Sequence, residues 1–175
     1  MSYSIRRATR NDISPLGSLL NAYMQETYGG AWGGNTQRLE QDLFGSTVDI
    51  LVAEAPEGEV IAFIAWVACY DLHWCMKGGD VIDLFVCSAH RSRGVAVMLI
   101  ARAATEIQGR GGTFLKGGAV ENPVVHRLYQ RIARNTSGHD YYVSGRAFRR
   151  LAELSGKRIR EILTNLPEAA WNQEP

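Results

Sequence analysis

The segment at residues 83–96 constrains the fold more than any other part of the sequence. An apolar run, Asp83-Leu84-Phe85-Val86, is followed by a basic loop that contains glycine and then by an apolar stretch with helical spacing. The backbone N–H groups of such a loop and of the first helical turn have no partner within the helix, and the helix dipole favours an anion there. The segment therefore predicts a strand, a pyrophosphate-binding loop and a helix, in that order.

The loop at residues 91–96 has two interpretations. In the first, its amides and arginines hold an anionic ligand, and the small residues Gly94 and Ala96 keep the approach open. In the second, Arg91 and Arg93 are solvated surface charges beside an ordinary turn, since a short motif of this kind also occurs by chance. A second motif is needed to decide between them.

The rest of the chain alternates strands and helices. A hairpin turn is expected at Pro56-Glu57-Gly58. Strands are predicted at 4–7, 50–55, 59–70, 80–87, 112–120 and 141–144, and helices at 12–25, 36–44, 95–108, 122–132, 147–154 and 157–163. With 175 residues, of which 46% are hydrophobic, the chain can bury one core of ordinary size. We expect a single α/β domain.

The charge balance excludes several classes of partner. Lys and Arg number 19 and Asp and Glu number 18, so no overall field attracts nucleic acid or a membrane surface. The arginines and lysines between 146 and 160 could bind an acidic partner, but such runs are usually solvated helix faces. No apolar stretch approaches the roughly 20 residues that cross a bilayer. We expect a soluble, cytoplasmic protein with no membrane or nucleic-acid partner.

Metal and thiol chemistry is not expected either. The four histidines lack metal-ligand spacing, and the three cysteines contain no Cys-x-x-Cys pair. Cys87 follows a predicted strand, where a cysteine is more often an inert apolar residue than an activated nucleophile. The sequence therefore favours neither a metal site nor a covalent intermediate on cysteine.

A second block, Val120-Glu121-Asn122-Pro123 followed by Val125-His126-Arg127-Leu128-Tyr129, comes after a further helix and strand. With the first block it resembles the GNAT N-acetyltransferase family. Residues 91–96 are similar to its acetyl-coenzyme A signature, Arg/Gln-x-x-Gly-x-Gly/Ala, and residues 122–129 to its Asn-x-x-Ala-x-x-x-Tyr pattern. The resemblance is strongest over about 80–132.

The family's fold is the first implication of this resemblance. It is an α/β fold of the α+β type, with a mixed, mostly antiparallel central sheet, helices on both faces, and a V-shaped opening between strands that end near Val86 and Val120. The domain would span 1–155, leaving a C-terminal helix and tail at 156–175. Relatives commonly dimerise, so a homodimer stays open.

The resemblance also implies a co-substrate, acetyl-coenzyme A, and a set of binding residues. These are Phe85, Val86, Cys87, Arg91, Ser92, Arg93, Gly94, Val95, Ala96, Asn122 and Tyr129. Attack of an amine on a thioester creates an oxyanion and expels a thiolate, so the site needs hydrogen-bond donors and an acid. Tyr129, protonated at neutral pH, would be that acid; its alternative role is to pack against the core.

The acceptor side is less determined by the sequence. Glu26 and Asp83, the latter through a water, are candidate bases, although Glu26 facing solvent is the other interpretation. The predicted acceptor-binding residues are Tyr23, Glu26, Tyr28, Trp32 and His73. After Tyr129 the chain departs from the family's Gly-Phe turn, which puts the last hairpin in doubt.

We therefore predict acetyl transfer to a primary amine of a small molecule, by direct attack in a ternary complex. Two alternatives stay open. The first is acetylation of a protein N-terminus or lysine, which needs a groove wide enough for a peptide. The second is a non-catalytic acyl-coenzyme A sensor or interaction module that has retained the fold.

Overall fold

The computed structural model describes residues 2–45, 47–118, 123–135, 141–168 and 171. Two 3₁₀ turns, at Arg10–Asp12 and Ser88–His90, precede α1 and α3. In chain order the elements are β1 (Ser4–Arg7), α1 (Ile13–Tyr28), α2 (Thr36–Phe44), β2 (Asp49–Glu54), β3 (Val60–Asp71), β4 (Met76–Val86), α3 (Val95–Gly109), β5 (Phe114–Gly117), α4 (Pro123–Ile132), β6 (Arg134–Asn135), β7 (Tyr141–Val143), α5 (Gly145–Glu153) and α6 (Ile159–Thr164).

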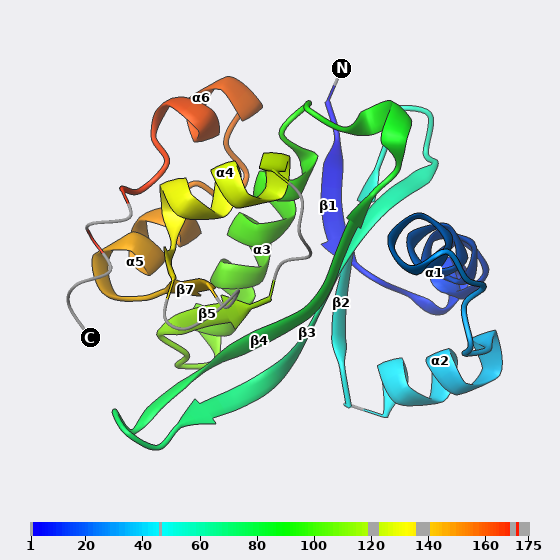
Figure 1. The fold of residues 1–175 in the computed structure, drawn as a ribbon, viewed down its shortest axis with the longest axis horizontal. Coiled ribbons are helices and arrows are strands. Elements are labelled where there is room, and N and C mark those ends of the chain that lie inside the picture. The colour runs from blue at the N-terminus through cyan, green and yellow to red at the C-terminus, as the bar shows by residue number, and fades with distance from the viewer. Residues whose placement is uncertain (1, 46, 119–122, 136–140, 169–170, 172–175) are drawn as a thin grey trace.

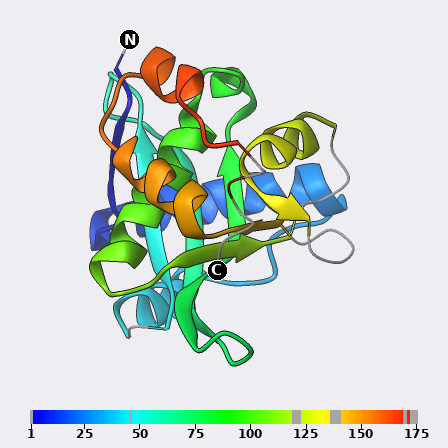
Figure 2. The same ribbon diagram turned by 90° about the vertical axis from the view of Figure 1, so that its left-hand side faces the viewer.

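The strands form one sheet in the order β1-β2-β3-β4-β5-β7-β6. Each neighbouring pair is antiparallel except β4 and β5, which are parallel. A parallel pair needs a crossover, and α3 supplies it. Helices α1 and α2 cover one face of the sheet, and α3 to α6 lie on the other (Figures 1 and 2). The predicted fold class is therefore confirmed.

The pairing between β4 and β5 is short. It runs only from Gly78–Val81 on β4 to Phe114–Gly117 on β5, whereas β4 continues to Val86. In the part of the chain that the structure describes, the last five residues of β4 thus have no strand partner on the β5 side. This is where the sequence predicted an opening; Val120, its other predicted margin, lies outside the described residues.

A β-bulge interrupts β4 at the start of this unpaired part. Asp83 pairs with Ala65 and Val81 with Trp66, so Ile82 is an extra residue on β4. Its side chain is 52% exposed. A bulge re-aims the side chains that follow it and is common next to active sites. Here it sets the orientation of Asp83.

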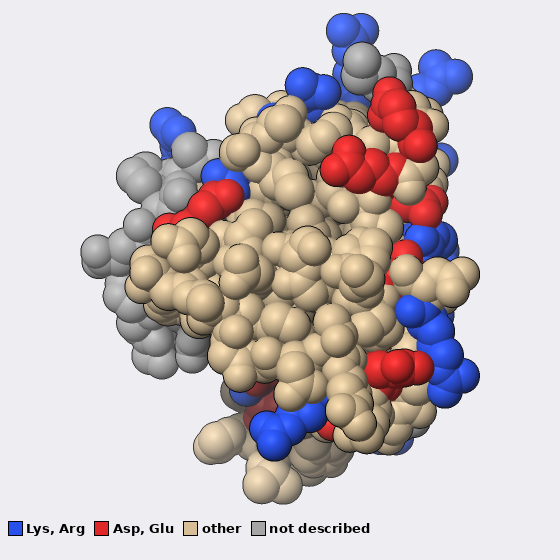
Figure 3. Space-filling view, turned by 90° about the vertical axis from the view of Figure 1, so that its right-hand side faces the viewer, with Lys and Arg blue, Asp and Glu red and all other residues tan. Residues whose placement is uncertain are grey.

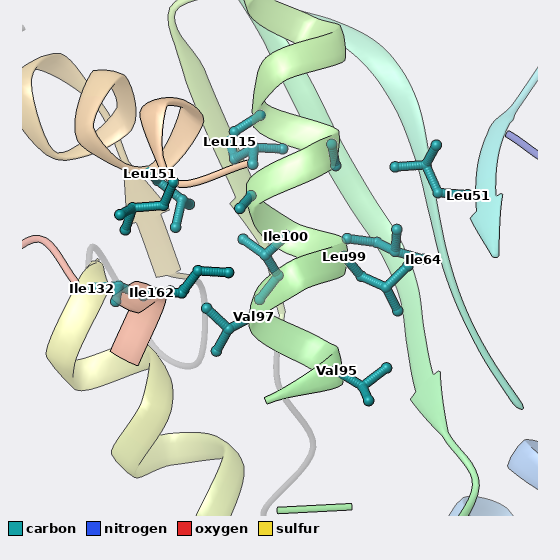
Figure 4. Close-up of a cluster of buried hydrophobic side chains, with 14 of the residues drawn as sticks. Leu51, Ile64, Val95, Val97, Leu99, Ile100, Leu115, Ile132, Leu151 and Ile162 are labelled. Carbon is teal, nitrogen blue, oxygen red and sulfur yellow. The ribbon is translucent and has the colours of Figure 1, made fainter. Parts of the chain in front are cut away.

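The larger hydrophobic cluster lies between the sheet and α3. Figure 4 shows Ile64 from the sheet beside Leu99 of α3, whereas Val97 and Ile100 lie on the other side of the helix, toward Ile162. The sequence of α3, rich in Ala, Leu, Ile and Val, favours a helix that is buried over most of its surface. Ile162 of α6 belongs to the same cluster, so at least part of 156–175 packs on the common core. The boundary at 155 stays a prediction.

The smaller cluster lies on the α1 face. It joins Leu16 and Leu19 of α1 to Val52, Phe63 and Phe85 of the sheet. Helix α1 ends where Gly29 takes a left-handed conformation, with φ 69°, and its N–H bonds to the carbonyl of Gln25. The helix thereby presents its last turn, residues 25–28, beside the end of β4. None of the described helices has the length and apolar composition that a membrane crossing requires.

Strand β5, predicted at 112–120, covers only Phe114–Gly117, and the start of β4 differs more. Strand β4 begins at Met76, four residues before the predicted start, and β3 extends to pair with it. Gly78 and Gly79 are typical of a turn, but here the ring of Phe114 occupies the space beside Gly78, where a Cβ would lie 2.6 Å from it. The glycines therefore belong to a strand that a neighbouring ring approaches closely.

Candidate active site

The loop between β4 and α3 has a conformation that exposes its amides. Ser92 and Gly94 both have positive φ, 59° and 82°, and α3 begins at the next residue, Val95. The first hydrogen bond of the helix runs from Met98 N to the carbonyl of Gly94, at 3.1 Å. Among the described residues, no acceptor meets the N–H groups of 92–97. Six consecutive donors at a helix start form a cradle for an anion.

Gly94 has a packing role in addition to the one that the sequence predicted. A Cβ on Gly94 would lie 2.6 Å from Cγ2 of Ile159, on α6, and the backbone φ of 82° is one that glycine alone adopts readily. Glycine is therefore required because α6 packs against the loop, in addition to any approach of a ligand. Ala96 is half-buried against the core, where a small residue fits.

The two arginines of the loop make different contacts. Arg91 donates from Nε to the carbonyl of Val86, at 2.8 Å, and pairs through Nη2 with Glu26, at 2.5 Å. Its guanidinium carbon lies 5.4 Å from the centre of the Phe85 ring. Arg91 thus ties the end of β4 to the last turn of α1, and Glu26 is engaged by this contact. The Glu26 side chain is still 43% exposed in this ion pair, so it faces solvent as one interpretation expected, and its role as a base stays a prediction.

Arg93 instead points toward the N-terminal strand. Its Nη1 lies 3.4 Å from the hydroxyl of Tyr3, and that hydroxyl lies 3.1 Å from Nδ1 of His90. The rings of Tyr3 and His90 meet edge to face at 5.8 Å. The sequence analysis did not select Tyr3 or His90, because nothing in the spacing links residue 3 to residue 90. Their contacts hold the loop from the β1 side.

Asp83 and Tyr23 are brought together on the α1 face. Tyr23 and Asp83 are neighbours that affect each other's pKa, and the Tyr23 ring lies 5.8 Å from that of Phe85 and 6.1 Å from that of Tyr28. Burial raises the pKa of Asp83, and the hydrogen bond from Tyr23 opposes that rise. Burial and the nearby Asp83 charge both raise the pKa of Tyr23, so its phenol stays protonated.

This group can hold and move a proton. A carboxyl group whose pKa is raised toward neutrality accepts a proton more readily than an ordinary aspartate, and such groups are common in active sites. Figure 3 shows the face that carries α1 and α2, with few charged side chains at its centre among the residues drawn in colour. Aromatic rings with a carboxylate on such a face suit a cationic or amine ligand.

Tyr129 lies at the end of the β4–β5 pairing. Together with Val81 and Gly117, the last paired residues of the two strands, it lines a small cavity of about 30 Å³. The side chain is half-buried against the large core, and the carbonyl of Tyr129 accepts from Ala133 N at 2.7 Å. Tyr129 therefore packs against the core and also lies close to the end of the β4–β5 pairing.

Two predicted acceptor residues are not at this site. The ring of Trp32 packs near Gly17 and Gly34, roughly 13 Å back along α1 from Glu26. His73 is at the tip of the β3–β4 hairpin, which projects away from α1 (Figure 1). The longer strands carry His73 roughly 20 Å from Asp83. Asn122, predicted to bind the cofactor, lies outside the described residues.

Cys87 is half-buried immediately after β4 and donates its N–H to the carbonyl of Ile61, at 2.9 Å. Burial, with the charges of Glu59 and Glu26, raises the pKa of its thiol. Since the thiolate is the nucleophilic form, this environment disfavours attack by Cys87. The raised pKa of the thiol supports the prediction that transfer is direct. The hydrogen bond to Ile61 uses the backbone N–H of Cys87, which is therefore out of reach of a ligand.

Comparisons with known proteins agree with this geometry. The sequence model of the acetyltransferase (GNAT) family matches residues 17–133, more than half of the chain. A search of curated proteins found no match.

Solved structures share the fold. A ribosomal-protein-alanine N-acetyltransferase from Brucella melitensis biovar Abortus 2308 has 22% identity and a TM-score of 0.64, covering 78% of this chain and 95% of its own. The PaiA N-acetyltransferase from Thermoplasma acidophilum, in complex with coenzyme A, has 16% identity and a TM-score of 0.65, with coverage of 82% and 99%. An aminoglycoside acetyltransferase from an uncultured soil metagenomic sample has 21% identity and a TM-score of 0.65, with coverage of 79% and 96%. The chain belongs to the GNAT acetyltransferase family.

Proposed function

We propose that the protein transfers the acetyl group of acetyl-coenzyme A to a primary amine of a small molecule. The GNAT fold supports acetyl transfer from acetyl-coenzyme A. The observation that carries the proposal is the run of N–H groups at 92–97 beside the unpaired end of β4. When bound, acetyl-coenzyme A supplies the acetyl group as an activated thioester.

The cofactor would lie along the described loop. The amides of 92–97 would hold its pyrophosphate, because unpaired donors at a helix start bind phosphate oxygens without a change in the protein. The edge of β4 that has no strand partner would meet the amide-containing arm before the Val86 carbonyl, which already accepts from Arg91. Arg91 would act indirectly, since its guanidinium is already bonded to Val86 and Glu26.

Two side chains would move protons. Asp83 would accept the proton of the amine through a water, since its raised pKa favours the protonated product. Tyr129 would donate to the leaving sulfur from the opposite side of the β4–β5 pairing. Tyr23, Tyr28 and Phe85 would surround the acceptor amine, with Asp83 supplying the only carboxylate among these four.

A small-molecule acceptor is supported by the enclosure of Asp83. Asp83 is half-buried on a strand instead of fully exposed. A slender amine reaches such a group more easily than a folded protein does. The experiments below distinguish this proposal from two alternatives, a peptide acceptor and a non-catalytic binding role.

The binding step is tested by titrating acetyl-coenzyme A into the protein and following the heat. We expect Arg93→Glu to weaken binding by about 100-fold, because it replaces a cation beside the cradle with an anion. Ser92→Pro should do the same, since proline cannot adopt the positive φ of residue 92. Ser92→Gly, which tolerates that φ, and Arg38→Glu, an equal charge change on α2, should bind as the wild type does.

The transfer step is tested by measuring thiol release with a panel of diamines, aminoglycosides and short peptides. Turnover with small amines supports the proposal, whereas turnover only with peptides would assign the protein acceptor. Cofactor binding without thiol release for any amine would assign the sensor. If folded wild-type protein binds no acetyl-coenzyme A, the proposed cofactor site is wrong.

A further inference from the structure

A second cavity lies outside the candidate active site, between β1, α3 and the segment that joins α5 to α6. Its volume is about 470 Å³, which is in the range of small-molecule sites. Ile5, Met98 and Ile159 provide apolar walls, and Arg102, Lys157 and Arg158 bring three cations to its lining. None of the described lining residues is an aspartate or glutamate.

Arg102 has a hydrogen-bonding group that the described protein does not satisfy. Its Nη2 pairs with Glu106 at 2.8 Å, but its Nε is buried and meets no acceptor among the described residues. A buried donor without a partner is rare and often marks the place of an unseen ion or water. Glu106, the nearest carboxylate, does not supply an acceptor for Nε, because it is bonded to Nη2 of Arg102 and to Arg7.

The charge around the pocket is only partly balanced. Although burial alone would raise it, the hydrogen bond from Arg7 and the charges of Arg7 and Arg102 hold the pKa of Glu106 below its usual value. Glu106 is therefore a shared anion for two guanidinium groups. Lys157 has a 3.5 Å contact with Glu161, and Arg158 has no ion-pair partner in the part of the chain described.

We propose that this pocket binds a small organic phosphate monoester at a site separate from the acetyl-coenzyme A groove. Guanidinium and ammonium groups from two segments converge on one cavity, which suits a dianionic phosphate better than a single carboxylate. The apolar walls would hold the organic part of the ligand. Arg102, whose side chain is 42% exposed, would contribute the charge of its guanidinium to the site.

Two residues that line the pocket contact the cofactor loop. Tyr3 lines it and contacts His90 and Arg93 of the loop, and Ile159 lines it and packs against Gly94. A ligand that shifts either residue therefore changes the energy of the loop conformation. By linkage, the factor by which the phosphate alters acetyl-coenzyme A affinity equals the factor for the reverse effect.

Phenyl phosphate is the test probe, because it joins a dianion to an apolar ring. Its binding is measured by isothermal titration at constant ionic strength, with and without saturating acetyl-coenzyme A. We expect binding in both conditions, and at least about tenfold weaker binding in Arg102→Met, as the loss of one charge-assisted contact predicts. Arg149→Met removes an exposed cation of α5 outside the pocket and should bind as the wild type does.

A double variant keeps the test valid if Arg102→Met does not fold. Lys157→Met with Arg158→Met changes exposed side chains and should weaken binding without loss of structure, which circular dichroism checks. No binding by wild type, equal weakening in Arg149→Met, or complete displacement by acetyl-coenzyme A would overturn the proposal. So would an Arg102→Met variant that loses affinity for coenzyme A but not for dephospho-coenzyme A, because the pocket would then hold the cofactor's own phosphate.

Discussion

The two faces of the sheet differ in the groups that they offer to a ligand. On the α3 side, the loop at 92–97 offers backbone N–H groups, which are set by φ angles and by packing against α6. On the α1 side, the chemistry depends on side chains, chiefly Asp83 held by Tyr23. A backbone site has a short sequence signature, whereas a side-chain site depends on contacts between distant positions. The first can therefore be found in a sequence more easily than the second.

The largest effect should come from Tyr129, which lies on the α3 side at the end of the β4–β5 pairing. Tyr129→Phe removes the proposed acid and keeps the ring that packs on the core. We expect kcat to fall by about 1,000-fold with little change in acetyl-coenzyme A affinity, because phenylalanine cannot donate a proton. Steady-state kinetics and titration measure the two quantities, with the exposed Tyr70→Phe as the matched control. An unchanged kcat would limit Tyr129 to packing.

A smaller effect is expected on the acceptor side. Asp83→Asn should lower kcat by about 100-fold, since the amide can still orient a water but cannot take its proton. The wild-type rate should rise with pH as Asp83 loses its proton, over a range above that of an ordinary aspartate, because burial raises its pKa. That rise should disappear in the variant and persist in Asp42→Asn, on the exposed face of α2.

Stability should respond to a carboxylate that neither ligand face uses. Asp12 is 3% exposed and accepts from Arg6 at 2.7 and 2.8 Å. The Arg6 hydrogen bonds, against the opposing effect of burial, lower the pKa of Asp12 to about 2. Asp12→Asn should therefore reduce the free energy of unfolding at pH 7 by about 2 kcal/mol.

The sign of this effect fixes its pH dependence. Because the folded-state pKa is lowered, the contribution of Asp12 is complete above the unfolded value near 3.8 and is lost as the pH falls toward 2. Urea unfolding of wild type and Asp12→Asn should converge over that interval, while the exposed Glu57→Gln should match wild type at pH 7. A constant difference at all pH values would contradict this role of Asp12.

The smallest effect tests how Tyr23 changes the pKa of Asp83, the proposed base on the α1 face. Tyr23→Phe removes the hydrogen bond that lowers the pKa of Asp83 and leaves the burial that raises it. The rise of kcat with pH should move to higher pH, with a nearly unchanged plateau. A pH–rate profile beside that of Tyr70→Phe measures the shift; a move to lower pH would show that Tyr23 does not stabilise the ionised form.

Much of the fold could be predicted because it depends on local patterns. Helices were predicted at 95–108, from apolar spacing, and at 36–44, and both are confirmed within one residue. The start of β4 was missed, because Gly78-Gly79 has the local signature of a turn and only the ring of Phe114, from a distant segment, shows otherwise.

The site could be predicted only in part for the same physical reason. The loop conformation follows from glycine and the start of a helix, which are local features. The pairing of Arg91 with Glu26 joins positions 65 residues apart, and no spacing rule indicates it. The displacement of His73 follows from the longer hairpin, so the error in a strand boundary became an error in the acceptor site.

The short β4–β5 pairing has a consequence for self-association. An unpaired strand edge usually invites pairing with another chain, which leads to aggregation. In this protein the unpaired end of β4 is in the middle of the sheet order, with β3 on one side and β5 on the other. A folded neighbour cannot easily reach such a recessed edge, whereas a narrow molecule that carries its own amide groups can. The sheet thus keeps an open hydrogen-bonding edge that excludes other proteins by its location.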